Sequence, residues 1–475
     1  MVKDRNIAVF YTCGVCNLRC SYCGIDKNPI LYKIDEALEE SFKGDYYINQ
    51  LKKYFPNRTQ LTRIETWGGE PFLHMDRIYP LLHQVIEYYP YFSEMFSSTN
   101  FSYPTWTDQF FGLMEQFGKY PDREFHYELQ LSMDGPEYIN DAGRGIGTTK
   151  KCLEVFNKFI ELLPNRLPPN VDLVVFFKPT LNNNSIRQLC DKQKIIEYYQ
   201  HFEALYDKIE QLKFNNVRYS ASIPNTAVPS PVTKEEGKTF AELCRLCREI
   251  EEENLEKEYF KFYRIITPFA NDSPRDFVTY QCRSKGCGSG SCMLGFLPNG
   301  LISTCHEGFT NLYEGYKEYA AKSKREETGD INFAAFVEET GPIYCVTEEG
   351  YAKHEAYMET LDIENATARL GNMTGLIIAL AMAGQIDEKY IEEYEALRAA
   401  FWMQNHTSYC IKDNYNRTGS YFLVPVGMLK LLLNGAIDYI GDVALPCAMN
   451  CPDCNCEKPE EEEKKEEPHL YGQSD

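Results

Sequence analysis

The chain lacks a surplus of positive charge and any long hydrophobic run. Its 475 residues include 49 lysines and arginines against 70 aspartates and glutamates, which gives a net charge of -21. A protein without excess cations is a poor candidate for neutralising the phosphates of nucleic acid. The longest apolar stretch, residues 375–384, is far shorter than the roughly 20 residues that a membrane-spanning helix needs. We therefore expect no membrane span, and nucleic acid is not an expected partner.

The amino terminus also lacks a signal peptide. Its first residues, MVKDRNIAVFYTCG, contain neither an extended apolar segment nor a small-residue cleavage site. Cysteine, in contrast, is abundant, with 18 residues. In a long chain without a secretion signal, clustered cysteines hold metals or take part in redox chemistry more often than they form disulfides. The sequence thus predicts a cytoplasmic protein with metal sites.

Strand and helix patterns alternate through the first part of the chain. Apolar strand patterns occur at 7–13, 63–69, 94–103, 126–135, 173–180 and 217–225, and helical patterns at 35–54, 74–89, 107–120, 148–163 and 185–212. Such repeats, joined by right-handed crossovers, predict an α/β fold with a parallel sheet, either curled or open. Functional residues are then expected at the carboxyl ends of the strands.

The rest of the chain differs in composition, and three further regions are predicted after a first domain at 1–230. Residues 231–350 form a cysteine-rich region that is organised by metal. Residues 351–456 are predicted as a helical segment that ends in a group of cysteines. Residues 457–475 have almost no apolar side chains and are predicted to be a disordered acidic tail.

Cys16, Cys20 and Cys23 lie within eight residues, directly after the first predicted strand. Three thiolates suit a four-iron, four-sulfur cluster and leave one of its irons open for an exchangeable ligand. A structural zinc site is the alternative, because Cys13 could supply the fourth thiolate that such a site needs. We favour the cluster, and zinc stays open as the alternative.

Two further segments follow other predicted strands. WGGEP at 67–71 ends the second strand, and its glycines would let a ligand approach the backbone closely. SMDGP at 132–136 follows the fourth strand. Each segment taken alone is typical of a turn. Lys178 and the asparagines at 182–184 hold the same place after the fifth strand, where a helix cap explains the asparagines equally well.

The spacing of Cys16, Cys20 and Cys23, with the aromatic Tyr22 before the last cysteine, resembles the cluster loop of the radical S-adenosylmethionine superfamily. The WGGEP and SMDGP segments resemble that superfamily's cofactor-binding segments. The resemblance implies a partial (β/α)6 TIM-like barrel in which the amino and carboxylate groups of S-adenosylmethionine bind the open iron. An electron from the cluster would cleave the cofactor to a 5′-deoxyadenosyl radical, which abstracts a hydrogen atom from the substrate. The implied cofactor-binding residues are Tyr22 at the adenine, Gly68, Gly69 and Glu70 at the methionyl amino group, and Ser132 and Asp134 at the ribose.

A second group of cysteines resembles the auxiliary-cluster domain called SPASM, because Gly300 lies five residues before Cys305 in a cysteine-rich region. The resemblance implies one or two auxiliary four-iron clusters. Their candidate ligands are Cys282, Cys287, Cys292, Cys305, Cys447, Cys451, Cys454 and Cys456. The last four depart from the family's spacing, so this group could hold either an iron–sulfur cluster or zinc.

Members of the auxiliary-cluster family modify ribosomally made peptides or convert a sulfatase residue to formylglycine. Sulfatase-maturing relatives have an aspartate after the cysteine that corresponds to Cys305, whereas this chain has His306 and then Glu307. This difference counts against sulfatase maturation, although Glu307 could act as the base. We take His306 and Glu307 as candidate catalytic residues.

The main hypothesis is an enzyme that abstracts hydrogen from a peptide or protein substrate to form a crosslink or an epimer, with a reductant such as a flavodoxin or ferredoxin. The alternatives are a radical enzyme that acts on a small metabolite or a nucleotide, and sulfatase maturation. A non-enzymatic alternative is an iron–sulfur electron carrier or a zinc-organised interaction protein. Such a protein would not need Gly68, Gly69 and Glu70 at a strand end.

Overall fold

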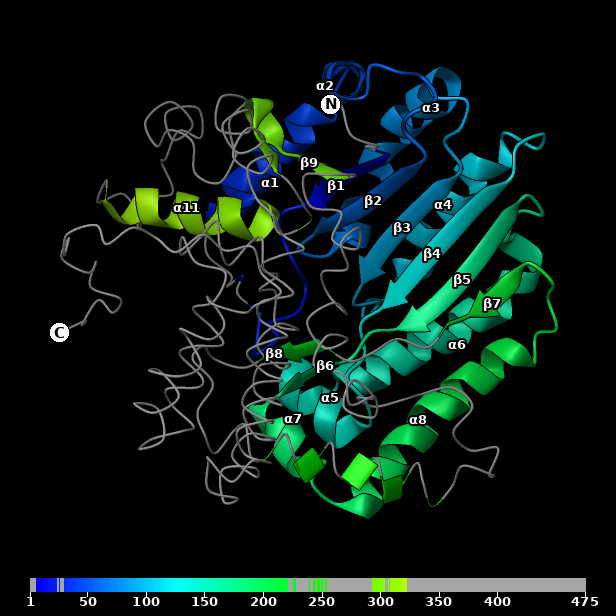
Figure 1. Ribbon diagram of the computed structural model, residues 1–475, viewed down its shortest axis with the longest axis vertical. Coiled ribbons are helices and arrows are strands. Elements are labelled where there is room, and N and C mark those ends of the chain that lie inside the picture. The colour runs from blue at the N-terminus through cyan, green and yellow to red at the C-terminus, as the bar shows by residue number, and fades with distance from the viewer. Residues whose placement is uncertain are drawn as a thin grey trace, which may run out of the picture.

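Figure 1 shows the computed structural model, which describes residues 6–23, 25, 30–220, 225–227, 293–303, 306 and 308–322, together with a few positions between 239 and 253. The candidate metal ligands other than Cys16, Cys20 and Cys23 lie outside the described residues, and so does Glu307. The predicted helical segment 351–456 and the acidic tail 457–475 lie outside them as well.

The described chain has an α/β fold built on an eight-stranded, mostly parallel sheet. Six strands run parallel in their order along the chain, as Figure 1 shows: β1 (Ile7–Cys13), β2 (Arg63–Gly68), β3 (Glu94–Thr99), β4 (Phe125–Leu131), β5 (Val171–Phe177) and β7 (Val217–Tyr219). The six predicted strands are confirmed, and their consecutive order is consistent with the predicted partial barrel.

Two more strands extend this sheet beyond β1. β9 (Met293–Phe296) pairs in parallel with β1, and β10 (Ile302–Ser303) pairs antiparallel with β9. Both come from the cysteine-rich region 231–350, so part of that region shares a sheet with the first domain. A separate parallel pair consists of β6 (Thr180–Asn182) and β8 (Asn225–Ala227).

Helical segments connect the strands. They are α1 (Ile30–Ser41), α2 (Tyr46–Tyr54), η1 (Pro71–Ile78), α3 (Tyr79–Tyr88), α4 (Trp106–Gly118), α5 (Glu137–Arg144), α6 (Thr148–Arg166), α7 (Asn183–Gln188), α8 (Lys192–Glu210), η3 (Pro298–Gly300) and α11 (Gly308–Lys322). Within the described residues, none of these helices is long and apolar enough to cross a membrane.

Two of the predicted helices are each divided in the structure. The pattern at 35–54 becomes α1 and α2, because Gly44 between them takes a φ of +64° that glycine adopts without steric cost. The pattern at 185–212 becomes α7 and α8. The Asp191 side chain caps α8 by accepting a hydrogen bond from the backbone N–H of Lys194 at 3.0 Å. Hydrophobic periodicity carries no signal for such breaks, so the sequence predicted one helix at each place.

The main hydrophobic core lies between one face of the sheet and the helices α2, α3, α4, α6 and α8. Alternate residues of β4, namely Phe125, Tyr127, Leu129 and Leu131, are buried in this core, as the period of two in a strand requires. The residues between them are half-buried and lie on the opposite face of the sheet. That opposite face therefore carries the polar side chains of the strands.

A second, smaller core covers β1 on the face opposite α2. Val9 and Tyr11 of β1 pack there with residues of α1 and α11, while the alternate residues Ala8 and Phe10 belong to the main core. Figure 1 shows α1 and α11 together on one side of β1. The strand that precedes the cysteine loop is thus buried on both faces, which gives that loop a rigid start.

Candidate metal and cofactor site

The cysteine loop follows β1 at the carboxyl edge of the sheet, as the sequence predicted. Cys16 and Cys20 are partly buried and Cys23 is exposed, and none of the three is part of a disulfide. The sulfur of Cys16 accepts hydrogen bonds from the backbone N–H of Leu18 at 3.4 Å and from the Asn100 side chain at 3.5 Å. Donors of this kind favour a sulfur that carries negative charge, as a metal-bound thiolate does.

Burial opposes that charge unless a cation is present. It raises the pKa of Cys16 to about 12, with a further contribution from the negative charge of Glu70. Burial also raises the pKa of Cys20, although the nearby Arg144 acts in the opposite direction. Iron bound at the loop would supply the positive charge that these sulfurs need to lose their protons. The donor set therefore fits an iron–sulfur cluster.

Cys13, the fourth ligand of the zinc alternative, has its thiol engaged within the protein. Its side chain is fully buried and its thiol donates a hydrogen bond to the carbonyl of Val15 at 3.2 Å. Among the described residues, no three histidine, cysteine, aspartate or glutamate side chains are gathered around a position for one metal ion.

The two glycines of the WGGEP segment lie against the cysteine loop itself. A Cβ atom on Gly68 would lie 2.2 Å from the carbonyl oxygen of Cys13, and one on Gly69 would lie 2.3 Å from that of Val15. The backbone N–H of Gly69 donates to the Cys13 carbonyl at 2.9 Å. We expected these glycines to admit a ligand. In the structure they admit the backbone of the loop, so their first role is to hold the loop in place.

Glu70 joins the ends of two strands. Its fully buried carboxylate accepts hydrogen bonds from the Thr99 hydroxyl at 2.6 Å, the Asn100 backbone N–H at 2.6 Å and the Phe72 backbone N–H at 3.2 Å. Burial nevertheless raises the pKa of Glu70 to about 7. Its oxygens are thus engaged within the protein, and the predicted contact with the cofactor amino group would come in addition.

Asp134 ties the cysteine loop to the end of β4. It is fully buried, and its carboxylate accepts hydrogen bonds from the Tyr22 hydroxyl at 2.6 Å, the Arg144 guanidinium at 2.7 Å and the Thr180 backbone N–H at 2.9 Å. The Arg144 guanidinium also lies 5.7 Å from the centre of the Tyr22 ring. The structure therefore brings together two predicted cofactor residues, Tyr22 and Asp134, that lie 112 positions apart in the sequence.

Sequence analysis assigned no role to Arg144 or Asn100, although Arg144 follows the SMDGP segment closely in the sequence. Arg144 is buried and, among the described residues, its Nε has no hydrogen-bond partner. A buried cation with an unused N–H group beside Cys20 is complementary to an anionic cluster or to a carboxylate of the cofactor. Asn100 follows β3 and contacts Cys16. The only signal for Asn100 in the sequence is its position, a polar residue directly after a strand.

The structure also places the residues predicted at the ends of β4 and β5. The backbone N–H of Ser132 donates to the carbonyl of Thr99 at 2.8 Å, which places the serine beside the end of β3. The side chain of Asn182 accepts from the backbone N–H of Ser185 at 2.9 Å and so caps α7. The helix-cap interpretation is confirmed for Asn182, whereas Asn183 begins α7. Lys178, at the end of β5, has its pKa lowered to about 8 by burial.

His306 also lies at the carboxyl edge of the sheet, although it is more than 200 residues after the WGGEP segment in the sequence. Its ring stacks on Trp67, with 4.4 Å between the ring centres and 19° between the planes. Its carbonyl accepts a hydrogen bond from the Tyr11 hydroxyl at 3.2 Å. This predicted catalytic residue therefore lies directly beside the WGGEP segment.

Solved structures similar to this chain include native anSMEcpe with bound AdoMet, at 17% sequence identity over 63% of this chain and 74% of that chain, with a TM-score of 0.38. Streptococcus suis SuiB bound to S-adenosylmethionine is 15% identical over 63% of this chain and 58% of that chain, with a TM-score of 0.35. Native anSMEcpe with bound AdoMet and Cp18Cys peptide is 14% identical over 63% of this chain and 74% of that chain, with a TM-score of 0.36. No family model matches the chain, and no curated protein matches it.

The arrangement as a whole can hold a cluster and an anionic ligand next to it. Cys16, Cys20 and Cys23 provide the thiols, Asn100 provides an N–H group to sulfur, and Arg144 provides a buried positive charge. Asn100 also donates to the Asn17 side chain at 2.8 Å, and Arg144 is paired with Asp134 at 2.7 Å, so both groups are held in position. A site of this kind can bind and orient a charged cofactor without reorganising.

Proposed function

We propose that this protein is a radical S-adenosylmethionine enzyme that acts on a peptide or protein substrate. The observation that supports this most strongly is the three-cysteine loop beside a buried arginine with an unused N–H group, at the carboxyl ends of the strands. When bound, the cluster and S-adenosylmethionine would supply a 5′-deoxyadenosyl radical that takes a hydrogen atom from the substrate.

The protein's own residues have binding and positioning roles in this proposal. Cys16, Cys20 and Cys23 hold the cluster and leave one iron open. Asn100 donates to the sulfur of Cys16, and Arg144 attracts the carboxylate of the cofactor. The loop stays in place because Gly69 and its neighbours pair with it and the Tyr22 hydroxyl is tied to Asp134.

The contact between His306 and Trp67 favours a substrate that reaches this edge of the sheet. His306 is next in sequence to Cys305, which is a predicted ligand of an auxiliary cluster. Its contact with Trp67 brings this part of the chain against the WGGEP segment, which is predicted to bind the cofactor. In the proposal His306 takes or gives a proton on the substrate, with Glu307 as a second candidate, and the peptide is crosslinked or epimerised. Auxiliary clusters at the remaining candidate cysteines and a flavodoxin or ferredoxin would supply or accept electrons.

The first test is cofactor cleavage. Protein reconstituted anaerobically with iron and sulfide should form 5′-deoxyadenosine from S-adenosylmethionine and dithionite, measured by chromatography. A variant with alanine at Cys16, Cys20 and Cys23 should form none. Cys190→Ala is the matched control, because this partly buried thiol lies between α7 and α8 and should be dispensable. Full iron loading without 5′-deoxyadenosine would refute the proposal and favour an electron carrier.

The second test concerns the substrate class. Short peptides encoded beside this gene are the probes, and mass spectrometry is the measurement. Loss of two hydrogen atoms from a peptide would indicate a crosslink, and uptake of one deuterium from heavy water would indicate epimerisation. Turnover of a nucleotide or a small metabolite with all such peptides unchanged would overturn the peptide assignment but not the cofactor chemistry.

A further inference from the structure

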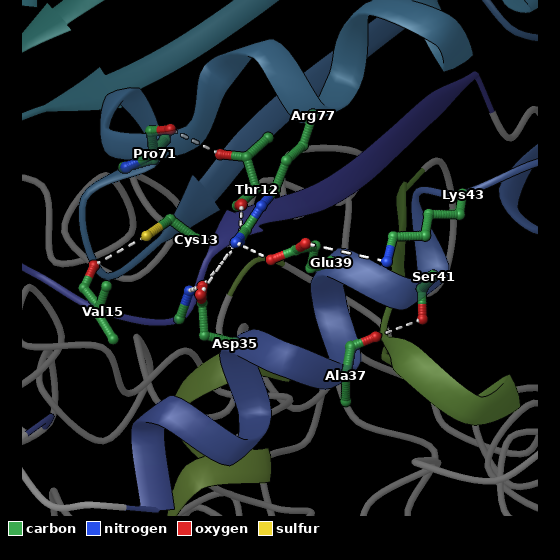
Figure 2. Close-up of polar contacts among 11 residues, drawn as sticks. Thr12, Cys13, Val15, Asp35, Ala37, Glu39, Ser41, Lys43, Pro71 and Arg77 are labelled. Carbon is green, nitrogen blue, oxygen red and sulfur yellow. Dashed lines mark hydrogen bonds and ion pairs between the residues drawn. The ribbon is translucent and has the colours of Figure 1, made fainter.

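Hydrogen bonds hold both the side chain and the backbone of Cys13. Its thiol donates to the Val15 carbonyl at 3.2 Å, as Figure 2 shows. Its carbonyl accepts a hydrogen bond from the Gly69 backbone N–H at 2.9 Å. The peptide groups on either side of it are also fixed. The carbonyl of Thr12 accepts a hydrogen bond from Arg77 at 3.1 Å, and the backbone N–H of Gly14 donates to Asp35 at 2.7 Å.

Arg77 and Asp35 form one largely shielded ion pair. The guanidinium donates to both carboxylate oxygens of Asp35, at 2.9 Å and 3.1 Å, and the two side chains are only 10% and 14% exposed. Arg77 also donates to Glu39 at 2.9 Å, but Glu39 is 51% exposed, so solvent weakens that contact. Because Asp35 lies on α1 and Arg77 on η1, the pair holds the end of β1 from two elements at once. We call Asp35 and Arg77 the clamp.

The clamp fixes a cysteine that could otherwise compete for metal. Cys13 and Cys16 are separated by two residues, a spacing that is common among metal ligands. The Cys13 thiol already lies 3.2 Å from the carbonyl oxygen of Val15, which belongs to the peptide group that leads into Cys16. A fourth thiolate would occupy the open coordination position of the cluster iron to which S-adenosylmethionine binds in the proposal.

Building on the proposed function, we propose that the clamp excludes Cys13 from the cluster and so keeps one iron open for the cofactor. Without the clamp, Thr12 and Gly14 lose their fixed partners and the Cys13 side chain can turn toward the cluster. Its thiol would release a proton to solvent and donate a sulfur electron pair to the open iron. Asp35 and Arg77 are therefore positioning residues that determine the number of cysteine ligands.

The test replaces the whole clamp with apolar side chains in the full-length protein. Asp35→Leu combined with Arg77→Met leaves no lone buried charge, so the fold should persist. We expect wild-type iron content, an electron paramagnetic resonance spectrum of the reduced cluster that no longer changes when S-adenosylmethionine is added, and at least a tenfold loss of 5′-deoxyadenosine. Adding Cys13→Ala to the same variant should restore both the spectral change and the product.

Three further variants complete the test. Cys13→Ala alone should resemble the wild type, and so should Glu39→Gln, which removes only the exposed partner of Arg77. If the double variant does not fold, Arg77→Lys is the second choice, because lysine keeps the charge but not the forked geometry. It should give a weaker spectral change that Cys13→Ala restores.

Two results would overturn the clamp's role. One is an unchanged response to S-adenosylmethionine in the clamp variants, and the other is failure of Cys13→Ala to restore that response. A wild-type protein that shows no response at all would refute the proposed function itself, and the clamp's role would fall with it. The wild-type arm therefore separates the two kinds of failure.

Discussion

The two ends of the same parallel strands carry polar residues of opposite character. At the amino ends, on the face away from the main core, Arg63 donates to Glu65 at 3.0 Å and to Glu128 at 2.7 Å. His126 lies 2.8 Å from Asp172 in the same network. These charges are paired with one another across neighbouring strands.

At the carboxyl ends of the strands, some buried polar groups have no hydrogen-bond partner among the described residues. Among the described residues, the buried Nε of Arg144 and the buried hydroxyl of Tyr103 have no hydrogen-bond partner. Both lie near the cysteine loop. Unused buried donors cost free energy, and a ligand bound beside these two could supply the missing acceptors. The difference favours a stabilising role for the amino ends and the proposed binding role for the carboxyl ends.

Arg144 should show the largest effect. Arg144→Met should lower the free energy of unfolding by about 3–5 kcal/mol, because it leaves the buried carboxylate of Asp134 without its cation. Arg144→Lys keeps that charge but loses the unused N–H group, so it should fold and form roughly tenfold less 5′-deoxyadenosine. Urea denaturation and the product assay measure the two effects. Wild-type product from Arg144→Lys would contradict a binding role for Nε.

Glu70 should make stability depend on pH at the binding end. Its pKa in the folded protein is raised to about 7, so folding favours the protonated form. That contribution is present at low pH and is lost as the pH rises through about 7. The free energy of unfolding of the wild type, minus that of Glu70→Gln, should therefore fall by on the order of 3 kcal/mol between about pH 4 and pH 8. A constant difference would show that burial does not control this carboxyl group.

Arg63 is the matched residue at the amino ends. Arg63→Met should lower the free energy of unfolding by about 2 kcal/mol, because Glu65, whose side chain is 9% exposed, loses its cation. Formation of 5′-deoxyadenosine should stay within about twofold of the wild type, since Arg63 is remote from the cysteine loop. A large loss of product from a stably folded Arg63→Met protein would contradict the assignment of stability to the amino ends of the strands and of binding to their carboxyl ends.

Asn100 should show the smallest effect. Asn100→Ala removes the N–H group that donates to the sulfur of Cys16, so the midpoint potential of the cluster should become more negative. A redox titration followed by electron paramagnetic resonance measures this shift. Gln130→Ala is the control, because Gln130 bonds to Ser98 at 2.7 Å on the same sheet without contacting the cysteine loop. Equal potentials in the wild type and Asn100→Ala would show that this hydrogen bond is absent when the cluster is bound.

Much of the fold and the centre of the site could be predicted from local patterns. The six parallel strands and the position of Cys16, Cys20 and Cys23 after β1 follow from hydrophobic periodicity and spacing, which are local properties of the chain. The division of the helix pattern at 35–54 was missed, because one glycine with a positive φ leaves the periodicity unchanged.

The sequence by itself determined an α/β protein with three thiols at the end of its first strand. Only the tertiary structure decided what those thiols face. The ion pair between Asp35 and Arg77, the approach of Arg144 to Cys20 and the stacking of His306 on Trp67 join residues from separate elements. Such contacts depend on strand register and on how the helices pack, and no local pattern encodes them. For that reason the position of the three thiols could be predicted, whereas the residues that surround them could not.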